Sequence, residues 1–261
     1  MPLQVFGVVR QGHPLPGSGR DRESVGVRLV ESGDLAAAVG EIEEGSELRE
    51  EDAARHLDIL ILLLRDGPVL PLAFGTLSPD EDAVRAEVLD PAAADLAQRL
   101  AAVDGYVETR LEIFFDEPTA LREVMEADPD VRALAAETQG ASSLDARIAL
   151  GEAVSMQLTS WRQQQAEALL ETLAPAVEDI VETESSEPLQ QRWAFLVRAD
   201  ALERLDDTVG RLRSSLQNAA AVEYVGPLPV YSFLGQVQAD TAPPRSNWEA
   251  PPTRSGSAWG W

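Results

Sequence analysis

Pro68-Val-Leu-Pro-Leu-Ala-Phe-Gly75 and Gly226-Pro-Leu-Pro-Val-Tyr-Ser-Phe233 are the two stretches that decide how this chain is organised. Each joins apolar residues of high β-propensity to glycine and to prolines, which lack a backbone donor. Such a sequence is typical of a strand at a sheet edge, or of a rigid turn into one. Together they contain one serine and one tyrosine, so they favour architecture or docking over catalysis.

Around the first stretch, apolar periodicity predicts a mixture of strands and helices, and therefore an α+β fold. We expect strands over residues 3–9, 25–30, 35–39, 69–74 and 106–115. We expect helices over residues 50–65 and 92–103, with an acidic turn at 80–82 between them. The first helix is apolar nearly all round, which predicts that it lies between two layers or is covered by something else.

The second half is mainly helical before it returns to strands. Pro118 and Asp128 mark the starts of two short helices, and a long helix begins near Ser143. Its apolar stripe is Leu150, Val154, Leu158, Trp161, Leu169, Leu173, Val177 and Ile180, with Pro175 predicted to kink or divide it. A strand over 193–197, a helix opened by Asp200 and Glu203 in a capping-box spacing, and a strand over 219–225 follow.

Residues 239–261 differ in composition from the rest of the chain. Proline, serine, threonine and glycine dominate there, so we expect a disordered tail. The tail nonetheless holds three of the five tryptophans, Trp248, Trp259 and Trp261. Two interpretations stay open, a tail of no consequence and one whose aromatic residues anchor a partner.

Charge and length limit the functional class. The 261 residues include 45 acidic and 21 basic ones, the latter all arginine, for a formal net charge of -24. Such a field repels phosphate backbones and anionic lipid surfaces, which excludes nucleic-acid and basic membrane-patch functions. A salt-adapted or biased composition would produce the same acidity. The chain has no long apolar run and no cationic N-terminal start, so we expect a cytoplasmic protein.

Residues for catalysis or metal binding are sparse. The chain has no cysteine, and its two histidines are His13, in a Gly/Pro-rich loop, and His56, an ordinary packed residue of the apolar helix. No H-E-x-x-H, phosphate-binding or nucleophile-elbow motif is present, and the acidic clusters lack the ligand spacing of an EF-hand. We expect no catalytic residue, no cofactor and no metal.

Several segments carry a family resemblance when they are taken in order. They are Val5-Phe-Gly-Val-Val9, Gly33-Asp-Leu-Ala-Ala37, His56 ahead of the first proline stretch, and the second proline stretch. Over about residues 3–237 the chain resembles gas vesicle accessory proteins of the GvpF/GvpL type. The usual double proline before the tyrosine is here Pro229-Val230.

The resemblance implies two domains, a ferredoxin-like N-terminal domain over 1–117 and, over 118–238, a helical linker with a smaller α+β domain. It also implies a non-enzymatic role in gas vesicle nucleation and assembly, through contacts with the hydrophobic shell protein and other accessory proteins, and a location at the gas vesicle. It carries over no catalytic residue. Whether this chain has an F-like or an L-like role stays open.

The motif residues that we single out are Pro68, Pro71, Phe74, Gly75, Gly226, Pro227, Pro229, Tyr231 and Phe233. We expect Pro71, Phe74, Gly226 and Tyr231 to shape the domains rather than to touch a partner. The main alternative function is a small-molecule-binding regulatory module, which a glycine-lined cleft between the modules would favour; a carboxylate-metal hydrolase would need a polar pocket with converging carboxylates. An exposed apolar groove would favour the assembly role.

Overall fold

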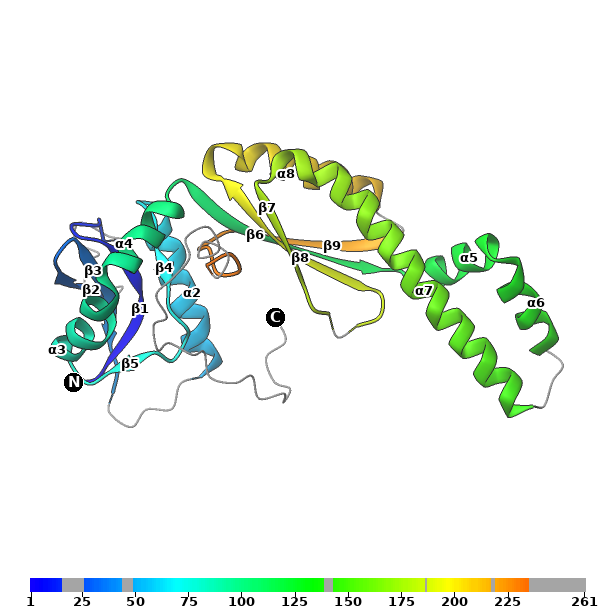
Figure 1. Cartoon of the computed structure of the whole chain (residues 1–261), viewed down its shortest axis with the longest axis horizontal. Coiled ribbons are helices and arrows are strands. Elements are labelled where there is room, and N and C mark those ends of the chain that lie inside the picture. The colour runs from blue at the N-terminus through cyan, green and yellow to red at the C-terminus, as the bar shows by residue number, and fades with distance from the viewer. Residues whose placement is uncertain (16–25, 44–48, 139–142, 186, 217–218, 235–261) are drawn as a thin grey trace.

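The protein folds into two antiparallel sheets with helices packed on them (Figure 1). The computed structural model describes residues 1–15, 26–43, 49–138, 143–185, 187–216 and 219–234. The predicted tail over 239–261 lies outside these residues. The α+β fold class predicted from the sequence is confirmed.

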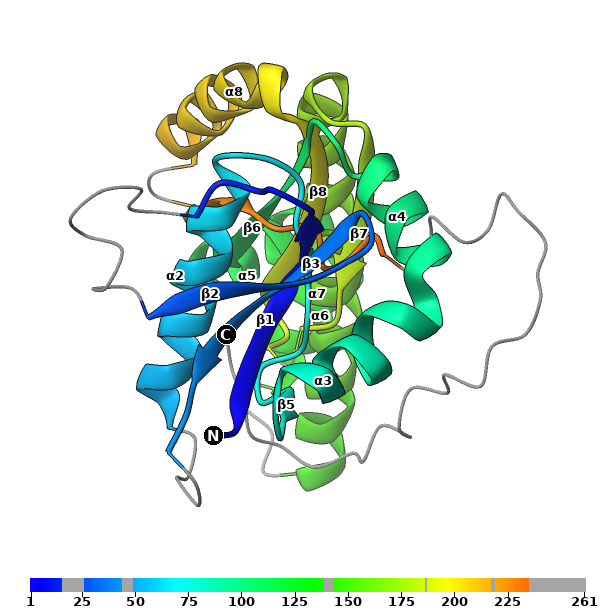
Figure 2. The same cartoon turned by 90° about the vertical axis from the view of Figure 1, so that its left-hand side faces the viewer.

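The first sheet has the strand order β2-β3-β1-β4, with β5 paired to another part of β1. Its strands are β1 (Leu3–Arg10), β2 (Val27–Ser32), β3 (Leu35–Glu41), β4 (Leu70–Pro71) and β5 (Leu77–Ser78). Seven consecutive residues of β1 are buried, because helices cover both faces of this sheet. Figure 2 shows α2 (Glu50–Leu64) on one side and α4 (Ala93–Ala102) on the other.

The apolar helix α2 lies between layers, as its composition predicts. Ile59, Leu60 and Leu63 pack into a core with Phe6 of β1, while Leu64 contacts the core of the second sheet. The segment at 80–82, expected to be a turn, is instead a helix start. Asp80 caps α3 (Glu81–Ala83) by accepting a hydrogen bond from the Ala83 amide at 2.9 Å, and a π-helical stretch (Val84–Leu89) and a 3-10 turn (Asp90–Ala92) lead to α4.

The second sheet has the strand order β7-β8-β6-β9. Its strands are β6 (Tyr106–Phe115), β7 (Asp179–Thr183), β8 (Gln190–Arg198) and β9 (Ala220–Leu228). The helices α7 (Leu144–Leu173) and α8 (Leu202–Ser215) cover one face (Figure 1). The core between them contains Trp193 and Phe195 of β8, Leu173 of α7 and Leu205 of α8.

Strand β6 lies in the second sheet, whereas the family resemblance implies an N-terminal domain over 1–117 that includes it. It pairs with β8 over nine residues, from Tyr106 opposite Arg198 to Phe114 opposite Gln190, and with β9 on its other edge. The strand spacing in the sequence does not reveal this, because both partners come from much later in the chain. We therefore propose that the boundary between the two units precedes β6.

Proline ends the long helix rather than kinking it. The helix α7 stops at Leu173, and Pro175 occupies a 3-10 turn (Ala174–Ala176), so Ile180, predicted in the helical stripe, lies in β7 instead. Proline at this position removes a helical donor and clashes with the preceding turn. Upstream, α5 (Glu117–Ala127) and α6 (Pro129–Thr138) begin where Pro118 and Asp128 predict.

The start of α8 also differs from the expected capping box. A 3-10 turn (Ala199–Ala201) precedes the helix, whose N-cap makes no side-chain hydrogen bond. The Asp200 carboxylate instead accepts hydrogen bonds of 3.0 and 3.1 Å from the guanidinium of Arg198. The Asp200 carboxylate therefore binds Arg198 and does not cap α8.

Candidate functional site

The first proline segment forms a much shorter strand than 69–74. Only Leu70 and Pro71 pair with β1, opposite Val8 and Gly7, and the Leu72 amide then donates to the Phe6 carbonyl at 2.9 Å. The chain leaves the sheet at a turn in which Gly75 has a φ of 86°, a left-handed value that favours glycine. Pro71 has no amide to donate to a further strand, which suits an edge position, and the chain pairs with β1 again at β5 after this turn.

The second proline segment continues from β9. The Gly226–Pro227 peptide bond is cis, and Leu228 pairs with Glu108 of β6. A Cβ at Gly226 would lie 2.6 Å from the Thr109 methyl group, so only glycine fits at this position. Pro229, Val230 and Phe233 are buried, whereas Pro227 is exposed.

A buried carboxylate holds the second segment in place. One oxygen of Glu108 accepts hydrogen bonds from the amides of Tyr231 (2.8 Å) and Ser232 (2.7 Å). The other accepts from the Ser232 hydroxyl and the Arg110 guanidinium, both at 3.0 Å. The Glu108 side chain is fully buried, and a buried carboxylate is tolerated when its oxygens are satisfied in this way. Sequence reasoning missed Glu108.

The two proline segments meet although they are far apart in sequence. Leu70, Val230 and Phe233 belong to one core cluster, which also includes Ala194 of β8. Val69 belongs to a second cluster, against which Tyr231 packs, and burial raises the pKa of the Tyr231 hydroxyl to about 12. The segments therefore lie at the junction where the two sheets share a core.

Phe74 does not occupy the position expected of it. Its side chain is 37% exposed, and its ring lies T-shaped to the His56 ring, with the ring centroids 5.7 Å apart. Phe74 lies in the turn between β4 and β5, outside the paired residues, which leaves its side chain at the surface. Of the four residues expected to shape the domains, Pro71 is buried and Tyr231 half-buried, Gly226 is confined by Thr109, and Phe74 lies outside the core.

Both histidines are buried, although the sequence placed His13 in an open loop. His13 Nε2 donates to the Leu63 carbonyl at 3.0 Å. His56 Nε2 donates to the carbonyl of Leu72 at 3.1 Å, which leaves Nδ1 to accept from the Gln4 amide at 3.3 Å. His56 thus ties the first proline segment to α2 and β1. Burial lowers the pKa of both histidines below the usual value.

These histidines predict a loss of stability below neutral pH. Their folded-state pKa values are lowered, so the unfolded chain takes up protons first, at about pH 6.5. The free energy of unfolding should therefore be constant above that pH and fall as the pH drops from about 6.5 towards 5.5, before most carboxylates titrate. Denaturant unfolding at pH 7.5 and 5.5 measures this, and His56→Gln should reduce the slope. A free energy that does not change over this interval would contradict the prediction.

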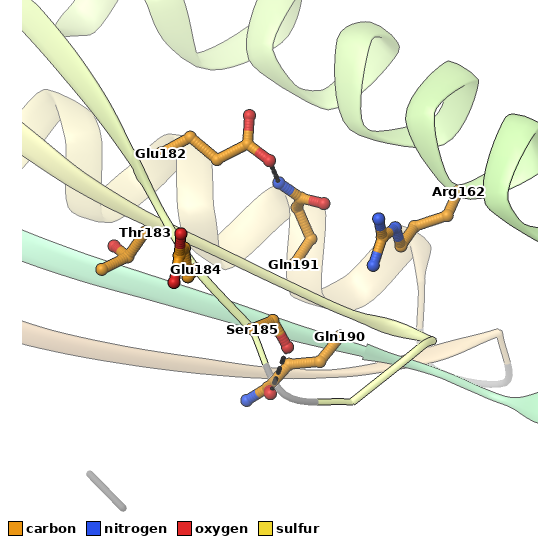
Figure 3. A pocket seen from close by; sticks show the side chains of 7 residues that line it. All are labelled: Arg162, Glu182, Thr183, Glu184, Ser185, Gln190 and Gln191. Atoms are coloured by element: carbon orange, nitrogen blue, oxygen red, sulfur yellow. Dashed lines mark hydrogen bonds between the residues drawn. The ribbon is translucent and has the colours of Figure 1, made fainter. Parts of the chain in front are cut away.

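A polar pocket of about 420 Å³ lies where β7 leads into β8 (Figure 3). Its lining consists of Arg162, Glu182, Thr183, Glu184, Ser185, Gln190 and Gln191. Two pairs of these side chains bind each other, since Gln191 donates to Glu182 at 2.6 Å and Ser185 to Gln190 at 2.7 Å. No histidine is near to activate the serine, and over the described ranges no three His, Asp or Glu side chains gather as a metal site.

An apolar groove of about 540 Å³ lies beside this pocket. Phe114 and Phe115 at the end of β6, Leu158 of α7, and Pro188 with Leu189 ahead of β8 contribute its apolar walls. Glu117 and Glu187 also line it. This arrangement suits contact with an apolar surface rather than chemistry on a polar substrate.

Comparison with known proteins matches residues 3–235, which contain both proline segments and Glu108, to the family described as gas vesicle synthesis protein GvpL/GvpF. The chain belongs to the GvpL/GvpF family. It is 31% identical over 241 residues to gas vesicle protein F of Streptomyces sp. (strain CB03234), a match that covers 90% of this chain and 100% of that protein.

Solved structures of GvpL/GvpF proteins share the fold. The crystal structure of GvpF from Anabaena sp. PCC7120 superposes with a TM-score of 0.77 at 18% identity, covering 89% of this chain and 98% of that one. GvpF from Microcystis aeruginosa gives a TM-score of 0.73 at 16% identity over the same shares. Among the described helices of this family member, none has the length and hydropathy needed to cross a membrane.

Proposed function

We propose that this protein is a non-enzymatic accessory factor of gas vesicle assembly. It binds the hydrophobic shell subunit and other accessory proteins during nucleation, in the cytoplasm and at the gas vesicle. The observation that carries the proposal is the family match over residues 3–235. A net charge of -24 supports it, because a strongly charged escort stays soluble while it holds an apolar subunit.

The two cavities also support this role over the alternatives. The groove at the end of β6 has apolar walls, as expected for a protein that holds an apolar partner. A small-molecule regulatory module would use a glycine-lined cleft between the sheets. The polar pocket instead lies at one end of the second sheet, and amide, hydroxyl and charged side chains line it.

Binding of the shell subunit is tested by co-expression and affinity capture. We expect the tagged protein to recover the shell subunit at several times the level recovered by an unrelated protein of equal size and net charge. The matched charge separates specific contact from attraction to any acidic surface. Equal recovery by the two proteins would contradict the proposed function.

A further inference from the structure

One face of α7 carries a stripe of mostly apolar and small residues, and the second sheet covers only the C-terminal half of this stripe. The stripe is Leu144, Ile148, Gly151, Ser155, Leu158, Arg162, Ala166, Leu169 and Leu173, at helical spacings of three and four. Ala166, Leu169 and Leu173 are buried in the core of the second sheet. Leu144 and Ile148 are 70% and 50% exposed, because α7 runs past the end of the strands (Figure 1). We call residues Leu144, Ile148, Gly151, Ser155 and Leu158 the α7 stripe.

The neighbouring helix α5 contacts α7 on a different face from the α7 stripe. Trp161, which donates a hydrogen bond of 2.9 Å to Glu123 of α5, projects about 100° around the helix from the stripe. Its ring also meets Phe115 at 5.1 Å. The helix α5 therefore packs along a different line of α7, and Leu144 and Ile148 stay exposed.

Gly151 in the middle of the stripe has no explanation within the chain. Glycine inside a helix is destabilising relative to alanine, so it is usually kept where another backbone approaches closely. A Cβ at Gly151 would meet nothing within 4 Å. Ser155, one turn later, is also small and exposed. This shallow place in an apolar stripe fits close approach by a second helix.

Acidic side chains line one flank of the stripe, whereas the exposed Arg147 lies on the other flank. Asp145 and Glu152, two turns apart, form the acidic flank, and Glu117 and Glu187 line the same groove as Gly151, Ser155 and Leu158. Residues 117–159 contain eight acidic residues and three arginines. A partner helix that fits this surface carries cations beside its apolar face, and a second copy of this acidic chain is disfavoured.

We propose that the α7 stripe docks an amphipathic helix of a partner protein, with lysine or arginine flanking its apolar face. From Leu144 to Leu158 the stripe is about 21 Å long, four turns of helix. The partner's apolar residues pack on Leu144 and Ile148, and its backbone approaches Gly151 in the groove that Gly151, Ser155 and Leu158 line. This inference rests on one part of the proposed function, namely that the protein acts by binding other proteins.

The test uses a fluorescent peptide of about 18 residues built from leucine and lysine as an amphipathic helix, and fluorescence anisotropy as the readout. We expect the intact protein to bind it, and Gly151→Leu and Ile148→Glu to bind at least about tenfold more weakly. Ile148→Glu adds a negative charge, so weaker binding of a cationic peptide cannot be electrostatic in origin. Gly151→Leu should melt no lower than the parent, since nothing lies near its Cβ.

Met156→Glu is the matched control, because Met156 is 72% exposed on another face of the same helix and should leave binding unchanged. Equal peptide affinity of the parent, Gly151→Leu, Ile148→Glu and Met156→Glu would overturn the proposal. A dimer of the parent protein in sedimentation that Ile148→Glu dissociates would also overturn it, because the stripe would then bind a second copy of this chain. Shell-subunit capture by the same variants separates the two proposals. If Gly151→Leu loses peptide binding and neither the parent nor any variant captures the shell subunit, the α7 stripe is supported as a docking surface. The proposed binding of the shell subunit is then rejected. Full capture of the shell subunit by Gly151→Leu together with unchanged peptide binding would overturn the inference.

Discussion

Glu108→Gln is expected to lower the free energy of unfolding by about 3–6 kcal/mol. Each oxygen of Glu108 accepts two hydrogen bonds, and a glutamine replaces one of those oxygens with an amide that can only donate. Two donors near the core then lose their acceptor, at about 1.5–3 kcal/mol for each bond to a charged group. Chemical denaturation measures the change.

The control is Glu223→Gln, the same substitution at an exposed position of β9 in the same sheet. It should change the free energy of unfolding by less than about 0.5 kcal/mol. Hydrogen exchange locates the effect, because the amides of Tyr231 and Ser232 should lose protection in Glu108→Gln before those in β1 do. If both glutamine variants unfold at the same denaturant concentration, Glu108 does not hold the segment.

A consequence of this arrangement is that one carboxylate couples the two sheets. Glu108 lies in β6 of the second sheet, and the residues that it holds pack against the first sheet through Val230 and Phe233. Loosening the segment therefore exposes apolar surface of both sheets at once. The second proline segment is in this sense part of the first sheet's core as much as a continuation of β9.

Much of the fold follows from local sequence patterns. Alternation and helical periodicity place β1, β3, α2 and β6 within one or two residues of their observed ends, because each has a clear apolar face. Sheet membership does not follow from them. The pairing of β6 with β8 and β9, and the short β7 after Pro175, depend on residues distant in sequence.

The candidate site is less predictable than the fold. The two proline segments are evident from composition. In the sequence, Glu108 looks like an ordinary acidic residue of an alternating strand, because the residue that donates to it, Tyr231, lies 123 residues later. Likewise, the sequence shows one apolar stripe on α7, whereas the helix uses two faces, one towards α5 and α6 and one towards the second sheet. Nothing in local periodicity shows where the sheet ends beneath that helix.

Phe233→Ala and Phe74→Ala change one phenylalanine in each proline segment, and we expect them to lower the free energy of unfolding by very different amounts. Phe233 is 1% exposed in the core shared by the sheets, and truncating a buried phenylalanine costs about 3–5 kcal/mol of unfolding free energy. Phe74 is 37% exposed and contacts the His56 ring at its edge, so its loss should cost about 1 kcal/mol. Denaturation of both variants at pH 7.5 compares them directly, with the histidines neutral in each. Equal losses would mean that Phe74 is packed as firmly as Phe233, contrary to its exposure, whereas a large loss for Phe233→Ala alone places the stabilising contact in the second segment.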